Sequence, residues 1–419
     1  MTHREDEMGD DTIGTVKPDQ ATRRTDADPA WLPVVALGMG TFTVGTDMFV
    51  LAGILGGIAE DFHVGVGTAG LTVTVFAASY AIGAVSLGAL LGPRPPRQVL
   101  IGSASLFGVV SVLSALAPTF PLLLVARIPA ALAASAYVPA AGAAAVAAVP
   151  PSHRGRALGM ILAGTSAAMV VSAPLGGLLA SALSWRAAFG LIALLAGATV
   201  AALLLTDARW SAPPVRDALR ERLRPARSPA VLGVLGVTLL VMTASFSMYT
   251  YLPLLVATGA GYPWIGLFGA AFGVGGMAGT WWGGTAADRR GPHRVGVLAV
   301  VGLAAGFTAL PHLATTAGGA LAVMVAWGVA AWGFVPAQQH RLIGLGAAAR
   351  IPGRPGTGVA APLLLALNSC AIQLGVAAGA LFGGMVVEGI GADRLWTVAV
   401  VCCAAALGGL GILGKAVRA

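Results

Sequence analysis

Long apolar runs recur along the whole chain, and this recurrence restricts the fold more than any other feature. Each run is long enough to cross a hydrocarbon core of about 30 Å as an α-helix. Strands of a membrane barrel would alternate in polarity over about ten residues, and these runs do not. The sequence therefore predicts an all-α membrane protein with twelve transmembrane helices, at about 32–57, 69–92, 98–117, 121–148, 157–182, 185–206, 229–257, 263–287, 295–313, 317–340, 359–387 and 394–414.

The composition supports a membrane protein and excludes several other classes. Hydrophobic residues make up 57% of the chain and charged residues 10%. All three cysteines lie in apolar runs, which argues against a disulfide framework and against a zinc or other metal site. The chain has no phosphate-binding loop and no common hydrolase motif with its partners. We therefore expect no cofactor and no enzyme activity.

Basic residues lie almost entirely on one side of the predicted membrane. Of the 25 lysines and arginines, the other side has only Arg186 and Arg394, and Arg127 lies inside a span. The positive-inside rule then predicts that both termini are cytoplasmic. We also expect the protein to lie in the cytoplasmic (inner) membrane. This bias also explains the net charge of +8, so we expect no nucleic-acid partner.

Polar stretches divide the chain into two groups of six spans. Residues 1–30 read as a disordered cytoplasmic tail, 31–206 as a first half, 207–228 as a cytoplasmic linker and 229–419 as a second half. The linker could form a short basic helix on the membrane surface or remain solvated. Related loops at 88–97 and 284–294 indicate a repeat. Parallel repeats of this kind place a substrate site between the halves.

The loop at 284–294 carries the pattern G-x-x-x-D-R-x-G-x-x-R. Asp288 can lie near a helix N-terminus, and Gly291 permits a tight reversal. The pattern resembles the signature loop of the major facilitator superfamily, in which Gly284, Asp288, Arg289, Gly291 and Arg294 would form a cytoplasmic gate. The first copy differs, with Gly92 and Pro95 at positions where that family has Asp and Gly. A simple basic turn is the alternative for both loops.

Other motifs extend this resemblance. Arg127 in the fourth span matches the superfamily's arginine motif, although Ala131 replaces a glycine. Ser172, Pro174 and Gly176 in the fifth span resemble the antiporter motif, and a seam of small packing residues is the alternative. Motifs over about 31–415 resemble the twelve-span drug:proton antiporter branch, which includes arabinose-efflux-like and chloramphenicol-resistance exporters. Gly56 departs from this branch, which commonly has proline there.

Among the 17 acidic residues, Asp47 alone lies clearly within a span. A carboxylate at the centre of a membrane helix costs roughly 2.5–3.5 kcal/mol on insertion scales, so its presence suggests a function. The directions of the spans bring Asp47 and Arg127 to similar depths, where they could meet. Desolvation raises the pKa of a carboxylate and a nearby arginine lowers it, which suits proton coupling. A static ion pair that joins two helices is the alternative.

Aromatic and amide side chains in the later spans are candidates for a substrate cavity. Apolar walls with a few polar anchors suit amphipathic organic ligands. We therefore expect a monomeric, proton-coupled exporter of small hydrophobic or amphipathic compounds, working by alternating access in the lipid bilayer. The alternatives are a selective exporter or importer of a sugar, nucleoside or amino acid, and a membrane sensor that does not transport. The cavity candidates are Phe246, Tyr249, Tyr251, Trp327, Trp332, Gln338, Asn368 and Gln373.

Overall fold

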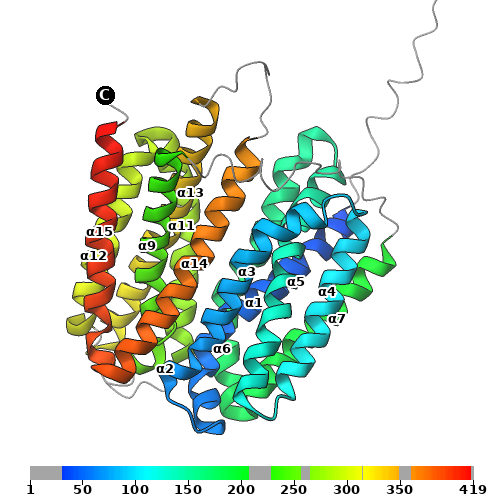
Figure 1. Ribbon diagram of the computed structural model, residues 1–419, viewed down its shortest axis with the longest axis horizontal. Coiled ribbons are helices and arrows are strands. Elements are labelled where there is room, and N and C mark those ends of the chain that lie inside the picture. Colours follow the sequence, from blue (N-terminus) through cyan, green and yellow to red (C-terminus); the bar gives the residue numbers. More distant parts are fainter. Residues whose placement is uncertain (1–30, 207–227, 256–264, 314, 349–359, 417–419) are drawn as a thin grey trace, which may run out of the picture.

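The part of the chain that the structure describes contains twelve long helices, as the apolar runs predict. The computed structural model describes residues 31–206, 228–255, 265–313, 315–348 and 360–416 (Figure 1). The 1–30 tail and nearly all of the 207–228 linker lie outside these residues. The long helices are α1 (Trp31–Asp61), α3 (Leu71–Leu90), α4 (Pro96–Ala115), α5 (Phe120–Ala147), α6 (Arg154–Ala182), α7 (Trp185–Leu205), α9 (Pro229–Tyr249), α11 (Ile265–Arg290), α12 (Pro292–Leu313), α13 (Ala317–Ala348), α14 (Ala360–Gly389) and α15 (Leu395–Ala416).

Short helical turns join some of the long helices, among them α2 (Val66–Ala69), η2 (Pro151–His153) and η4 (Ala392–Arg394). In the part of the chain that the structure describes, eleven long helices are both long and apolar enough to span a membrane. The twelfth long helix, α11, is rich in glycine and ends in Asp288, Arg289 and Arg290, which lowers its hydropathy. The protein is therefore a multi-pass membrane protein.

The helices pair in the same way in each half of the chain. In the first half α1 packs on α6, and α4 packs on both α5 and α7. In the second half α9 packs on α14, and α12 packs on both α13 and α15. Small residues permit the closest approaches, because a Cβ on Gly53 of α1 would lie 2.7 Å from the backbone of α6. We call these groups the N-terminal and C-terminal halves (Figure 1).

The helix pairs α3 with α14 and α6 with α11 make the main connections between the halves. We call the face on which α1 begins and α15 ends the terminal face, at the top of Figure 1, and the opposite one the distal face. The short helix α2 lies on the distal face and packs on α14. The glycines of α11 that contact α6 lie between Gly266 and Gly276, in the part of α11 nearer the distal face. The halves are therefore joined at the distal face and near the middle of the bundle.

Candidate functional site

A buried ion pair joins α1 to α5 inside the N-terminal half. The Nη1 and Nη2 atoms of Arg127 donate to Oδ1 and Oδ2 of Asp47 at 2.6 and 2.7 Å. Both side chains are 1% exposed. Among the described residues they are the only charged side chains that are buried. A bidentate pair of this kind is strong and directional, and it offsets the cost of burial only while both partners remain.

Helices α3 and α7 enclose this ion pair. The Arg127 guanidinium carbon lies 4.3 Å from the centre of the Phe76 ring and 5.5 Å from that of Phe189. Its Nε atom also donates to the carbonyl of Thr72 at 3.4 Å. Aromatic faces attract a cation most strongly where water is excluded. Arg127 therefore has partners on α3 and α7 in addition to Asp47.

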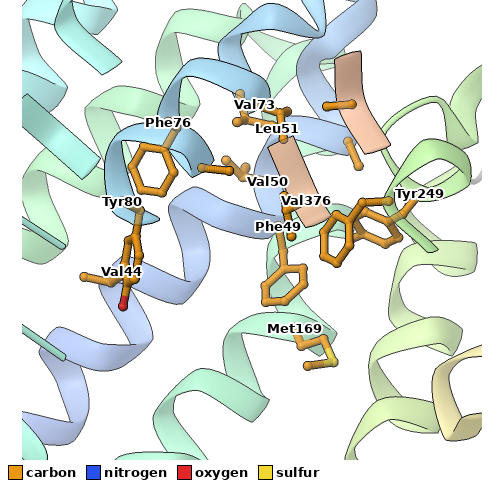
Figure 2. Packing of buried hydrophobic residues seen from close by; sticks show 14 of the residues in the cluster. Val44, Phe49, Val50, Leu51, Val73, Phe76, Tyr80, Met169, Tyr249 and Val376 are labelled. Carbon is orange, nitrogen blue, oxygen red and sulfur yellow. The ribbon is translucent and has the colours of Figure 1, made fainter. Parts of the chain in front are cut away.

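A small cavity lies between the halves, and Phe76 is one of its lining residues. Helices α1 and α3 form one wall, and α9 and α14 the other. Phe246 and Gln373 line it from the C-terminal half, and Gln373 is the only amide in the lining. The Oε1 atom of Gln373 is buried without a hydrogen-bond partner in the structure. Figure 2 shows Phe76 beside Tyr80, and Val73 next to Leu51. We call this space the inter-half cavity; its lining is Met48, Leu51, Val73, Phe76, Ala77, Phe246, Gln373 and Val376.

Aromatic side chains of the C-terminal half gather around Phe49 of α1. The Phe49 ring centre lies 6.0 Å from that of Tyr249 and 6.2 Å from that of Trp332. Figure 2 shows Phe49 between Met169 and Tyr249. The hydroxyl of Tyr249 and the Nε1 of Trp332 are buried without hydrogen-bond partners in the structure. Trp327 lies deeper and donates from Nε1 to Ser245 at 3.4 Å. These predicted residues therefore form one cluster where the halves meet.

Two predicted amides lie elsewhere, inside the C-terminal half. Gln338 is fully buried and donates from Nε2 to the carbonyl of Val234 at 3.2 Å. Asn368 accepts a hydrogen bond from Thr238 at 3.2 Å. Neither residue lines the inter-half cavity. The structure therefore separates Gln338 and Asn368 from Gln373, which the sequence grouped together.

Tyr251 lies at the distal face, in a set of contacts between the halves. Its hydroxyl lies 2.7 Å from the carbonyl oxygen of Ala380 and 3.3 Å from that of Gly67. Nearby, Oε1 of Glu388 accepts hydrogen bonds from the amide and hydroxyl of Thr68, at 2.7 and 2.8 Å. We call these five residues the distal latch. Sequence reasoning could not find this contact of Glu388, because its partner Thr68 lies 320 residues away along the chain.

The motif loop joins α11 to α12 at the terminal face. Gly291 has a φ of 83°, a conformation that favours glycine. Asp288 lies 3.3 Å from Nε2 of His340 on α13, and both side chains are exposed. Arg289 and Arg294 are also exposed, and Gly284 is half-buried. The structure thus places Asp288 beside a histidine of α13.

The antiporter-like motif positions α6 between α1 and α11. A Cβ on Gly176 would lie 2.9 Å from the carbonyl oxygen of Val50, so α1 and α6 touch through their backbones. Pro174 packs against Gly266 of α11. Ser172 is fully buried, and its hydroxyl has no hydrogen-bond partner in the structure. This segment of α6 therefore contacts both halves.

Comparison with known proteins agrees with this architecture. The family model described as Major Facilitator Superfamily matches residues 37–355. A chloramphenicol resistance protein of Streptomyces lividans is 35% identical over 294 residues, covering 68% of this chain and 73% of that protein. A chloramphenicol efflux pump of Mycobacterium tuberculosis is 30% identical over 374 residues, covering 85% of this chain and 87% of the pump. The inner membrane transport protein YdhP of Escherichia coli is 30% identical over 370 residues, covering 85% of this chain and 89% of that protein.

Solved structures show the same fold at lower sequence identity. An inward-facing, occupied bacterial homologue of the lysosomal transporter Spinster has a TM-score of 0.72 at 16% identity, covering 91% of this chain and 96% of that one. The nucleoside transporter NupG has a TM-score of 0.69 at 12% identity, covering 91% of this chain and 99% of that one. Together with the family match and the pairing of the helices, these similarities show that the chain belongs to the major facilitator superfamily of membrane transporters.

Proposed function

We propose that the protein is a proton-coupled exporter of small, uncharged amphipathic compounds. The observation that supports this function is the position of Phe76. One ring lies over the Arg127 guanidinium and also lines the inter-half cavity. A change in the ion pair would therefore alter the wall of the space in which a substrate would bind.

Asp47 would be the proton carrier of the cycle. A proton on Asp47 removes its negative charge and weakens the bidentate pair with Arg127. Arg127 would keep its contacts with the Thr72 carbonyl and the Phe76 ring, both on α3. Because α3 packs on α14, a shift of α3 would reach the C-terminal half. By linkage, a substrate that binds better in one protonation state must in turn change proton binding by the same factor.

The lining of the inter-half cavity suggests the class of substrate. Its side chains are apolar or aromatic apart from Gln373, and none is charged. Such a wall would favour an uncharged molecule with an apolar ring and a group that can donate to the free Gln373 oxygen. Chloramphenicol, the compound named for two of the relatives, serves as the first probe. The cavity has room for about one water molecule, so the halves would have to move apart to admit it.

The direction of transport would follow from the membrane orientation. The excess of arginines on the terminal face would make that face cytoplasmic. The distal latch would then close the outer side while the cavity loads from the cytoplasm. A proton arriving from outside at Asp47 would open the ion pair and release the substrate outward.

The test is chloramphenicol transport by purified protein in proteoliposomes under an imposed pH gradient. The wild type should move chloramphenicol against its gradient, and a protonophore should stop it. Asp47→Asn should abolish this uphill movement, because the carboxamide cannot exchange a proton. Asp393→Asn is the matched control, since Asp393 is an exposed carboxylate, 72% accessible, and should leave transport intact. Uphill transport by Asp47→Asn at the wild-type rate would refute the coupling role.

A second candidate is a selective exporter of a polar metabolite. The buried amides favour it, because Gln338 Oε1 and Asn368 Nδ2 lack partners and could serve a ligand with many polar groups. Competition for chloramphenicol binding by a panel of sugars, nucleosides and amino acids distinguishes the two. Strong competition by one polar compound alone would favour this candidate.

A further inference from the structure

A second cavity lies inside the N-terminal half, away from the interface between the halves. Helices α1, α4, α5 and α7 enclose it, all from the same half. It has room for about one water molecule. We call it the hydroxyl cavity, because four hydroxyl groups line it, those of Thr43, Ser103, Tyr137 and Thr199.

The hydroxyl groups are arranged to accept hydrogen bonds from a water molecule. Thr43, Ser103 and Thr199 each donate to the backbone carbonyl four residues earlier, at 2.9, 2.6 and 2.9 Å. Each oxygen therefore keeps lone pairs free toward the cavity. The Thr43 and Thr199 oxygens are 3.5 Å apart. Since all four side chains are at least nine-tenths buried, a water here would have the polar partners that buried water needs.

Tyr137 reaches this space only because residue 40 is glycine. A side chain at Gly40 would collide with the Tyr137 hydroxyl. That hydroxyl lies 3.3 Å from the carbonyl oxygen of Leu37, one turn nearer the terminal face. The cavity thus has a polar group that points along α1 toward that face.

Asp47 lies between the two cavities along α1. Thr43 is four residues before Asp47, which places it one turn away on the same face of the helix. Gly40, Thr43 and Val44 line the hydroxyl cavity, whereas Met48 and Leu51 line the inter-half cavity. The hydroxyl cavity is therefore on the terminal side of the carboxylate, and the inter-half cavity is on its distal side.

We propose that the hydroxyl cavity holds a water that receives the proton of Asp47 and passes it toward the terminal face. This relay rests on the proposed function. The Asp47 carboxyl gives its proton to the water, and the water gives another of its protons to a neighbouring hydroxyl, whose own proton moves on toward the terminal face. The carboxylate then pairs again with Arg127. The remaining path along α4, from Ser103 to the start of the helix at Pro96, is about 10 Å long.

The proton and the substrate would consequently use different routes. A substrate would move between the halves, while the released proton would leave within the N-terminal half. Phe76 contacts Arg127 and also lines the inter-half cavity, and neither Asp47 nor Arg127 lines that cavity. This separation lets the proton leave without crossing a cavity that an apolar compound fills.

The test measures proton movement in proteoliposomes with an internal pH dye, driven by a chloramphenicol gradient. The double variant Thr43→Val/Thr199→Val removes two acceptors at nearly constant volume. It should slow proton release by about tenfold or more, as expected when a positioned proton-transfer group is lost. Chloramphenicol binding at equilibrium should be unchanged. Thr43→Ser/Thr199→Ser keeps both hydroxyls and should restore the rate.

Thr46→Val is the matched control, because Thr46 is 1% exposed on α1, donates to the Phe42 carbonyl at 2.9 Å and lines neither cavity. If the double valine variant does not purify as a folded protein, Ser103→Ala replaces it with the same expectation. Wild-type proton release by the valine variant, or by its replacement, would overturn the relay. If Asp47→Asn moves protons normally, or if chloramphenicol drives none in the wild type, the proposed function fails and the relay fails with it.

Discussion

The two halves share their helix pairing but differ in what they bury. The N-terminal half encloses Asp47 and Arg127, with four hydroxyls in the adjacent cavity. The C-terminal half encloses Gln338, Asn368 and a cluster of aromatic rings, and among its described residues no charged side chain is buried. The same backbone pairing thus supports an ionised interior in one half and a neutral one in the other.

The difference suggests a division of labour between the halves. An ion pair needs rigid partners, because the loss of either one leaves a buried charge. A surface that accepts varied apolar compounds needs large rings and few fixed polar groups. Because the ion pair and the apolar surface belong to different halves, the interior of each half has to meet only one of these two requirements. The inter-half cavity is then the place where the two meet.

The first prediction concerns stability and has the largest expected effect. Arg127→Leu leaves the Asp47 carboxylate buried without its partner and should destabilise the protein by about 3–5 kcal/mol. Adding Asp47→Asn should recover much of this loss, because the double variant has no buried charge. The measurement is unfolding of purified protein in detergent. Gln338→Leu in the C-terminal half is the comparison, and an equal loss there would break the contrast between the halves.

The second prediction concerns Gln373, the amide of the inter-half cavity. Gln373→Leu should weaken chloramphenicol binding by about three- to tenfold, since one neutral hydrogen bond contributes about 0.5–1.5 kcal/mol. Substrate-driven proton movement at saturating chloramphenicol should remain, because Asp47 and Arg127 are untouched. The measurement is equilibrium binding together with proton release in proteoliposomes. A loss of proton movement with unchanged binding would contradict the division of labour.

The third prediction has the smallest effect and concerns the exposed contact at the terminal face. Asp288 and His340 are 69% and 55% exposed, so solvent screens their attraction. His340→Ala should change the unfolding free energy by less than about 1 kcal/mol. The measurement is the same unfolding assay. A loss as large as that of Arg127→Leu would show that exposure is a poor guide to the strength of ion pairs in this protein.

Sequence reasoning identified the fold and one part of the candidate site for clear physical reasons. Helices that cross a membrane must be long and apolar, so the spans and the charged exceptions stand out. Asp47 and Arg127 are such exceptions, and their depths followed from the directions of their helices. The structure shows their direct contact, at 2.6 Å.

Other features could not be found in this way. Phe76 and Phe49 are aromatic residues in apolar helices. Nothing in the neighbouring sequence indicates that Phe76 lines a cavity or that Phe49 contacts the other half. Gln338 and Asn368 lie on helices that are apolar on nearly every face, so their spacing cannot tell the interior of a half from the interface between halves. The partner of Glu388, Thr68, belongs to the other half and becomes visible only when the halves are assembled.

The distal latch has a consequence for controlling the protein from its distal face. At this seam Gly67 lies against the Gly384 carbonyl so closely that no side chain would fit between them. Glu388 holds the seam through hydrogen bonds to Thr68, on a surface that solvent reaches. A wedge only a few atoms wide, placed there by a small molecule or an antibody loop, could hold the seam apart. With the distal face outside the cell, as proposed above, such an agent would stop transport without entering the cell.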